Sequence, residues 1–508
     1  MDEQAQPDKL AARGRESEPA PALQDVEKRA GAEEGGDLSA SSPPLQEKPQ
    51  EVERDEDGSV EQVYTATVDY RLRRHVRILL HYHFSLTVLL RSCCSSMVAF
   101  TYPGVEAEFH VSQEVATLAL SLFVLGMGLF PLLVGPLSEW YGRSPVYFIG
   151  FALYIIFNFL VAFSNNIGAL LVGRFLAGAA GSAFLSVAGG TVADLFRPHE
   201  VGAPMGFYTA GPIISGFINE HLDWRYTWYI LIAWAGAEYA ALLFFVPETY
   251  LPAVLKARAK KLRKAGRTDV RAPIEIDDRS IPRVLLTSCY RPFQILALEP
   301  MALVLCTWTA ILLGILYMFF SAYGIVYRQY GFSTQIVGLT YIPLGLGVII
   351  GGLCHPIWAR YYRRKTEQLG RRPPPEEHLR KGLYGVILCP LSLFWFAFTT
   401  YHHVHWIVSL IATVPFGIGM LWSFQAVFLY LVDAFRPVAA SAMAANSAMR
   451  SSFAAAFPLF TTQMFNTLGT QYALMLTAFL CLAMVPFPFL FFKVGHKYRR
   501  GSKFANSE

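Results

Sequence analysis

Long apolar segments alternate with short polar stretches along most of this chain. About twelve segments are apolar enough to be membrane spans, at residues 78–102, 115–138, 146–164, 167–191, 203–219, 227–246, 298–323, 335–358, 383–400, 404–431, 439–465 and 470–492. A run of roughly 20 apolar residues crosses a bilayer as a helix. The polar stretch 247–297 divides the segments into six and six. The pattern predicts an all-α membrane protein with two six-helix bundles, residues 76–246 and 298–493.

Polar sequence flanks and joins these bundles. Residues 1–75 are rich in Glu, Pro, Ala and Ser and nearly free of aromatics, so they lack the apolar surface that offsets chain entropy. We expect a disordered N-terminal tail with no signal peptide, because no short apolar region follows Met1. Residues 247–297 are expected to form a cytoplasmic loop, and residues 494–508 a cytoplasmic tail.

Composition excludes an ordinary soluble protein. The 508 residues are 53% hydrophobic and only 16% charged, and the mean hydropathy is +0.34. Residues 1–75 contain 18 of the 38 acidic residues and 10 of the 43 basic ones, which leaves 33 basic and 20 acidic residues for the remainder. Such an excess can indicate nucleic-acid binding, but these basic residues border the apolar segments. Membrane topology is the preferred explanation, and no nucleic-acid partner is expected.

The positions of the basic residues orient the chain. Large basic clusters lie within 256–271 and 360–381, whereas the first loop on the other side carries Glu106, Glu108 and Glu114 and no base. Loops rich in Lys and Arg remain in the cytoplasm. Both termini and the 247–297 loop are therefore predicted to be cytoplasmic.

A short motif ends the second apolar segment. Gly135-Pro-Leu-Ser-Glu139-Trp-Tyr-Gly142-Arg143 places a carboxylate and an arginine in a very tight turn between two spans. Glu139 and Arg143 are expected to pair with each other or with helix ends at the interface. The stretch resembles the loop between helices two and three of the major facilitator superfamily, although Ser144 replaces the usual final basic residue. The resemblance implies that Gly135, Glu139, Gly142 and Arg143 form a conformational latch.

Further segments resemble the fungal twelve-span drug:proton antiporter branch, close to its multidrug and polyamine exporters. They include Pro247-Glu-Thr-Tyr-Leu-Pro252, the embedded Arg174 with Gly178 and Gly181, and Arg450 through Phe460. The resemblance implies a substrate site between the bundles and alternating access around it. It also implies export of small amphipathic or cationic organic molecules in exchange for protons, by a monomer in the plasma membrane or, alternatively, the vacuolar membrane. No cofactor is implied.

Two departures from the branch support an alternative function. Helix five retains only Gly211-Pro-Ile-Ile-Ser-Gly216 of the branch's antiporter motif, as though about eight residues, or two helical turns, were absent after Ala210. Residues 81–94 also differ from the branch. An incorrect gene prediction or a decayed, non-transporting relative explains both equally well.

Three ionisable residues lie at membrane depth, where charge is expensive and indicates function. By resemblance Arg174 is a proton-coupling candidate, and Glu238 in helix six is a second one, since a buried carboxylate can exchange protons or bind a cation. Arg450 is either a cavity charge or a tie to helix ten. Structural pairing is the alternative for each.

Aromatic residues recur at helical spacings in the second half. Tyr317, Phe320, Tyr341, Trp422 and the neighbouring Gln425 are substrate-cavity candidates, because aromatic walls with a few polar groups suit amphipathic or cationic molecules. Such stripes are more often plain packing. The sequence contains no nucleophile–base pair and no metal-ligand spacing among its seven cysteines, so neither an enzyme nor a metal site is expected.

Overall fold

The computed structural model describes most of residues 87–504. It leaves out residues 1–86, 88, 91, 196–208, 246–247, 249, 267–270, 273–274, 276–280, 402, 503 and 505–508, together with the side chains of 184–195, 245, 251 and 281–284. The predicted N-terminal tail and the segment before helix five lie outside the described residues.

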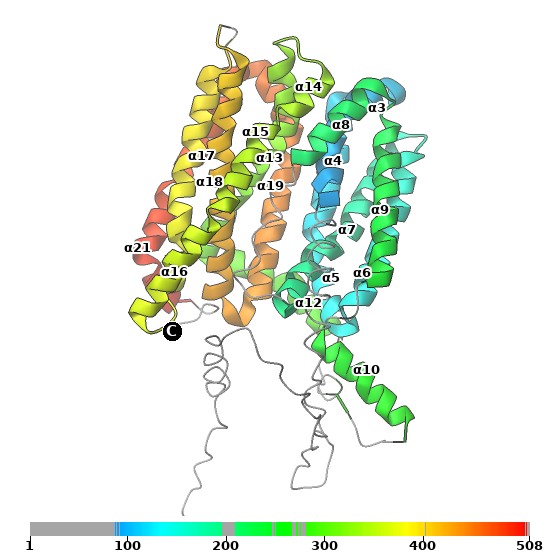
Figure 1. Cartoon of the computed structure of the whole chain (residues 1–508), viewed down its shortest axis with the longest axis vertical. Coiled ribbons are helices and arrows are strands. Elements are labelled where there is room, and N and C mark those ends of the chain that lie inside the picture. The colour runs from blue at the N-terminus through cyan, green and yellow to red at the C-terminus, as the bar shows by residue number, and fades with distance from the viewer. Residues whose placement is uncertain are drawn as a thin grey trace, which may run out of the picture. The chain divides into compact units, whose positions relative to one another are not determined.

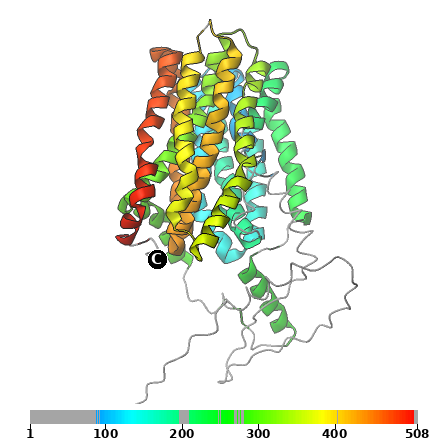
Figure 2. The same cartoon turned by 60° about the vertical axis from the view of Figure 1, so that its left-hand side comes forward.

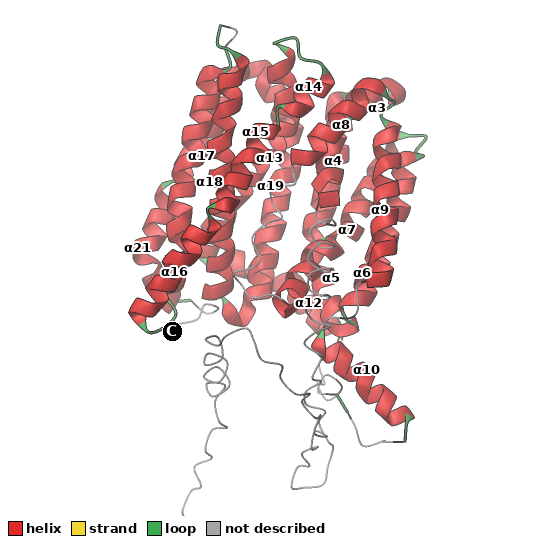
Figure 3. Ribbon diagram, in the orientation of Figure 1, coloured by secondary structure: helices red, strands yellow, loops and turns green. Residues whose placement is uncertain are grey.

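The chain folds almost entirely into helices (Figures 1 and 3). In the first half they are η1 (Met97–Phe100), α3 (Tyr102–Phe109), α4 (Gln113–Leu129), α5 (Pro131–Tyr141), α6 (Arg143–Ala162), α7 (Ile167–Leu195), α8 (Ala210–His221) and α9 (Arg225–Phe245). The connecting region contains α10 (Leu251–Lys264) and α12 (Ile281–Leu298).

The second half continues with α13 (Pro300–Arg328), α14 (Thr334–Leu339), α15 (Ile342–Leu353), α16 (His355–Leu369), η4 (Pro375–His378), α17 (Leu379–Thr399), α18 (Trp406–Ala434), η5 (Arg436–Val438), α19 (Ala439–Leu468), α20 (Thr470–Met484) and α21 (Pro486–Arg500). Figure 2 shows that the axes of the long helices α17, α18 and α19 and of the α20–α21 pair are roughly parallel.

Among the described residues, seven helical segments are long and apolar enough to cross a membrane, and an eighth if α4 and α5 form one span. The remaining expected spans correspond to the chain before Phe100, α7, α8 and α19. The first and α7 are only partly described, α8 is 12 residues long, and α19 contains many Ser, Thr and Asn residues. Apolar side chains such as Ile149, Ile156 and Phe159 are exposed on α6, as expected of a surface that faces lipid.

Prolines account for the breaks in several spans. Pro131 is at the N-terminus of α5, and the axes of α4 and α5 differ by 42°. A proline has no N–H to donate to the preceding turn, so it begins a new helix more easily than it continues one. Pro300, Pro356 and Pro486 start α13, α16 and α21 in the same way.

Glycines allow the closest helix contacts. A Cβ added at Gly178 of α7 would lie only 2.1 Å from the carbonyl oxygen of Phe123 in α4, so only glycine fits there. Between the halves, a Cβ at Gly338 of α14 would lie 2.6 Å from the Pro212 carbonyl oxygen of α8. Helix five, described from Ala210 onward, thus makes a close contact with the opposite half, of the small-residue type common in membranes.

Candidate functional site

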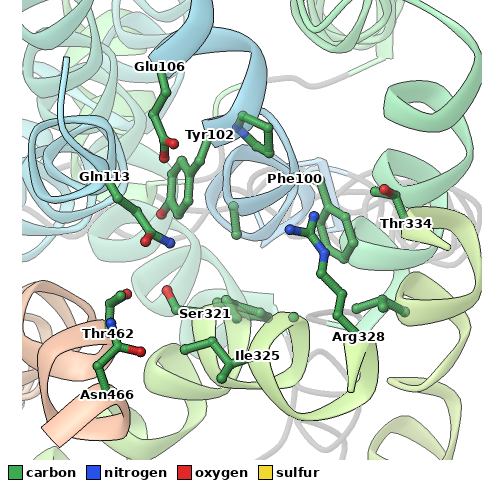
Figure 4. Close-up of a pocket in the computed structure, with 15 residues that line it drawn as sticks. Phe100, Tyr102, Glu106, Gln113, Ser321, Ile325, Arg328, Thr334, Thr462 and Asn466 are labelled. Carbon is green, nitrogen blue, oxygen red and sulfur yellow. The ribbon is translucent and has the colours of Figure 1, made fainter. Parts of the chain in front are cut away.

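A cavity of about 400 Å³ lies between the two halves (Figure 4). It is lined from the first half by Ala99, Phe100, Tyr102, Pro103, Glu106 and Gln113, and from the second by Phe320, Ser321, Gly324, Ile325, Arg328, Thr334, Val337, Thr462 and Asn466. These residues lie near the ends of α3, α4, α13, α14 and α19 that the charge pattern places outside the cell. This end of the molecule is called the outer end below. The volume suits a small organic molecule.

Aromatic residues form the inner part of the cavity wall. Phe320 and Phe100 line it, and Tyr341 packs against both, with ring centroids 5.8 and 6.4 Å away. Tyr317, one turn further from the outer end, meets Phe320 edge to face at 5.3 Å. The predicted cavity residues Tyr317, Phe320 and Tyr341 therefore form one cluster, of which Phe320 lines the cavity and the two tyrosines support it.

Below this cluster the halves are in contact. The Tyr317 hydroxyl donates a hydrogen bond of 3.1 Å to Ser95 Oγ, and both residues are fully buried. Nearer the cytoplasmic end, a Cβ added at Gly128 of α4 would lie 2.1 Å from the Ser451 Cβ of α19, and α12 packs on both α5 and α19. The cavity therefore lies on the outer side of these contacts. At the outer end the halves also meet, since Glu220 accepts a 2.9 Å hydrogen bond from the Thr334 N–H and His221 lies 3.1 Å from Gln335.

Arg174 is fully buried inside the first half. Its Nε donates to the Ala119 carbonyl at 2.9 Å, and its terminal nitrogens donate to the Cys94 sulfur and carbonyl, each at 3.3 Å. The guanidinium also lies 4.1 Å from the Phe123 ring centroid and 4.8 Å from that of Trp228. Within the described residues no carboxylate pairs with it. The positive charge of Arg174 is stabilised by the carbonyl dipoles and by the faces of the two aromatic rings.

Glu238 lies in the same half and is only 2% exposed. Its Oε1 accepts a 2.8 Å hydrogen bond from Trp234 one turn earlier on α9, whereas Oε2 has no hydrogen-bond partner among the described residues. A buried carboxylate that lacks a basic partner is costly in its charged form.

The other predicted site residues lie elsewhere in the second half. The Arg450 guanidinium lies 5.4 and 5.0 Å from the ring centroids of Phe424 and Phe428, so it ties α19 to α18, which is helix ten. Trp422 donates to the Gly351 carbonyl of α15. Gln425 accepts a short hydrogen bond from Lys381 of α17. None of the three lines the cavity.

The motif loop has a partner that the sequence does not suggest. Glu248 accepts hydrogen bonds from the backbone N–H groups of Arg143 and Ser144, at 2.9 and 3.0 Å, and so caps the N-terminus of α6. The Arg143 side chain donates to Ser138 at 2.7 Å and lies 4.9 Å from the Tyr250 ring. Gly142 has φ of 100°, which favours glycine. Glu139 is exposed.

The polar lining of the cavity is not predicted from the sequence. Glu106 is expected only as a loop charge, and no motif points to Tyr102, Gln113, Arg328 or Asn466. Their distance from one another along the chain hides their proximity in space. The available signal was that Glu106 and Arg328 each follow a membrane span at its outer end.

Comparison with known proteins identifies the family. The sequence profile described as "Major Facilitator Superfamily" matches residues 84–458. The chain belongs to the Major Facilitator Superfamily. It is 45% identical over 399 residues to "Efflux pump atB" of Aspergillus terreus, covering 75% of this chain and 84% of that protein. It is 37% identical over 451 residues to "Probable drug/proton antiporter YHK8" of Saccharomyces cerevisiae, covering 85% and 87%.

Solved structures agree on the fold. The human organic anion transporter MFSD10 superposes with a TM-score of 0.57 at 15% identity, over 81% of this chain and 99% of the other. The proton:xylose symporter XylE gives 0.58 at 15% identity, over 82% and 95%. The predicted all-α major facilitator fold and the resemblance to fungal drug:proton antiporters are confirmed. The protein is a multi-pass membrane transporter with a small-molecule substrate.

Proposed function

We propose that this Major Facilitator Superfamily protein exports small amphipathic organic molecules, cationic ones included, in exchange for protons across the plasma membrane. The observation that carries the proposal is the cavity between the halves, about 400 Å³ in volume. Its aromatic inner wall and polar outer rim match a ligand that has an apolar body and a polar group. The relatives named efflux pump and drug/proton antiporter support the direction and the coupling.

Protons couple to transport through Arg174 and Glu238 in this proposal. Both side chains are buried in the first half, and neither has an opposite charge beside it among the described residues. A proton on Glu238 removes a buried charge, so uptake and release of that proton change the free energy of the first half. Movement of the halves between outward- and inward-facing states then becomes linked to the proton gradient.

The decayed, non-transporting alternative is not favoured. Its support was the short helix five, but α8 still packs through Gly216 against Gly338 of the opposite half. The chain also spans 84% of the efflux pump and 87% of the antiporter to which it is compared, so no large part of the fold is missing relative to them.

The test uses the full chain in proteoliposomes with an imposed pH gradient and a panel of lipophilic cations, neutral drugs and polyamines. Wild-type protein should move at least one amphipathic compound against its gradient. Glu238→Gln should abolish gradient-driven movement but preserve substrate counterflow, because glutamine still accepts from Trp234 and cannot carry the proton. Arg174→Lys should abolish both, since one ammonium cannot replace a guanidinium that bonds three acceptors between two rings.

The matched control is Asp223→Asn, which neutralises an exposed carboxylate between α8 and α9 within the same half. It should leave the dependence of transport on the pH gradient unchanged. Wild-type gradient dependence in Glu238→Gln would assign Glu238 a structural role. Failure of every panel compound to accumulate against its gradient would overturn the proposed export.

A further inference from the structure

Two opposite charges face the cavity from different halves. The close-up in Figure 4 shows the Glu106 carboxylate and the Arg328 guanidinium on different sides of the opening, both directed inward. Glu106 comes from α3 in the first half, and Arg328 is the last residue of α13 in the second. Within the described part of the chain, neither side chain has a hydrogen-bond or ion-pair partner.

The neighbouring charges are occupied elsewhere. Glu108, two residues after Glu106, accepts hydrogen bonds from Arg225 and from Trp224 at the outer end of α9. Glu114 does not line the cavity, but its charge acts on Glu106. Among the described residues that line the cavity, Arg328 is the one base and Glu106 the one acid. The lining therefore presents one positive and one negative site, each available to a ligand.

The uncharged lining is divided in the same way. Figure 4 places Tyr102, Gln113, Thr462 and Asn466 on the side of Glu106, where hydroxyl and amide groups can support a hydrogen-bond donor. Phe100 and Thr334 lie on the side of Arg328. Phe320 and Ile325 supply apolar surface to the lining. A flat apolar body can therefore lie between two polar ends.

We propose that this cavity binds dipolar substrates, whose anionic group is held by Arg328 and whose cationic group is held by Glu106 with an aromatic body between them. The inference rests on the proposed export function and narrows its substrate class. A molecule with one positive charge would pair with Glu106 but would be repelled by Arg328. A simple anion would pair with Arg328 but would be repelled by Glu106. A dipolar molecule neutralises both walls at once, one from each half, and so bridges the halves.

The carboxyl of Glu106 is well suited to this role. Partial burial raises its pKa, and the nearby Glu114 carboxylate raises it further, while the Arg328 guanidinium acts in the opposite direction. A cationic ligand group would take the place of the proton. Binding of the cationic end is therefore expected to weaken at an acidic outer pH, and Gln113 and Asn466 provide no competing charge.

Three probes that share one ring test the inference: 4-(aminomethyl)benzoate as the dipolar molecule, 4-methylbenzylamine as the cation and 4-methylbenzoate as the anion. Their affinities for the purified full-length protein in nanodiscs are measured at neutral pH. The dipolar probe should bind at least about tenfold more tightly than either singly charged probe, a difference of about 1.4 kcal/mol. Arg328→Gln should weaken the dipolar and anionic probes about tenfold and should not weaken the cation. Glu106→Gln should weaken the dipolar and cationic probes about tenfold and should not weaken the anion.

Asp223→Asn is the matched control, because it removes an exposed outer carboxylate that does not line the cavity. It should alter none of the three affinities. Equal weakening of all three probes in both cavity variants would show that Glu106 and Arg328 act only on the conformation of the halves, and equal affinities of the three probes for wild-type protein would show no dipolar preference. Either result overturns the inference. Export of a lipophilic cation such as rhodamine 6G by the same protein would leave the proposed function standing.

Discussion

The Tyr317 hydroxyl of the second half donates a hydrogen bond of 3.1 Å to Ser95 Oγ of the first half, and neither residue is exposed. The bond lies on the side of the cavity that we expect to face the cytoplasm. Any motion that separates the halves on that side must break it, so it stabilises the state in which that side is closed.

Tyr317→Phe should shift the transporter toward the inward-facing state. Loss of one buried hydrogen bond is worth about 1 kcal/mol, roughly a fivefold change in the equilibrium. Labelling of engineered cysteines on the cytoplasmic side should rise accordingly. Tyr327→Phe is the control, because the Tyr327 hydroxyl bonds Ser409 within the second half. Equal labelling of Tyr317→Phe and wild-type protein would show that the bond does not bias the two states.

Glu248→Ala should destabilise the motif loop. The variant removes the carboxylate that caps α6 at Arg143 and Ser144, and a lost cap costs about 1–2 kcal/mol. The thermal unfolding midpoint in detergent should fall, and Glu139→Ala in the same loop should leave it unchanged. An unaltered midpoint in Glu248→Ala would mean that water replaces the cap.

Glu275 makes the connecting loop sensitive to acid. Two hydrogen bonds of 2.8 Å from Arg263 of α10 are the main reason that its pKa is lowered to about 2. A lowered pKa stabilises the folded loop above the ordinary carboxyl pKa, and this contribution is lost as the pH falls toward 2. At each pH the rate of pepsin cleavage within 251–275 is therefore compared between wild-type protein and Glu275→Gln. The wild-type rate should be well below that of the variant at pH 4 to 5 and should approach it toward pH 2, and a ratio that does not change with pH would contradict this assignment.

Topology gives a further check. The basic residues of 256–271 should lie in the cytoplasm, because positive loops are retained there. A glycosylation acceptor inserted near Gly266 should remain unmodified, while one inserted in the outer loop after Thr400 should be glycosylated. Glycosylation of the acceptor near Gly266 would show that the chain has the opposite orientation in the membrane.

The fold could be predicted from sequence much more completely than the site. The length of each apolar segment predicts a span, and the basic residues in the loops predict its orientation, without knowledge of how the spans pack. The motif near Gly135 points to the family. The cavity depends on which faces of α3, α13 and α19 meet, and periodicity does not determine that choice. Trp422 and Gln425 belong to an aromatic run as convincing as that of Phe320, yet they contact Gly351 and Lys381 inside the second half.

Helix five offers a direct test of the missing turns. Adding about eight family-like residues after Ala210 would supply two more helical turns. If the present α8 is too short, the insertion should raise both yield and proton-driven export. An insertion of the same length between residues 267 and 270 is the control. Equal yield and export with and without the insertion after Ala210 would show that the short helix is sufficient.

The contact between Gly216 and Gly338 also bears on how fast the transporter can turn over. The two halves meet there backbone to backbone, and one turn further out His221 contacts Gln335 and Glu220 accepts from the Thr334 N–H. Once these two outer hydrogen bonds open, one helix can slide on the other at the glycines without a change of side-chain rotamer. Gly338→Ala would hinder this movement. The variant should show a slower transport cycle with unchanged affinity for the substrate, so this contact would set the rate of transport and not its selectivity.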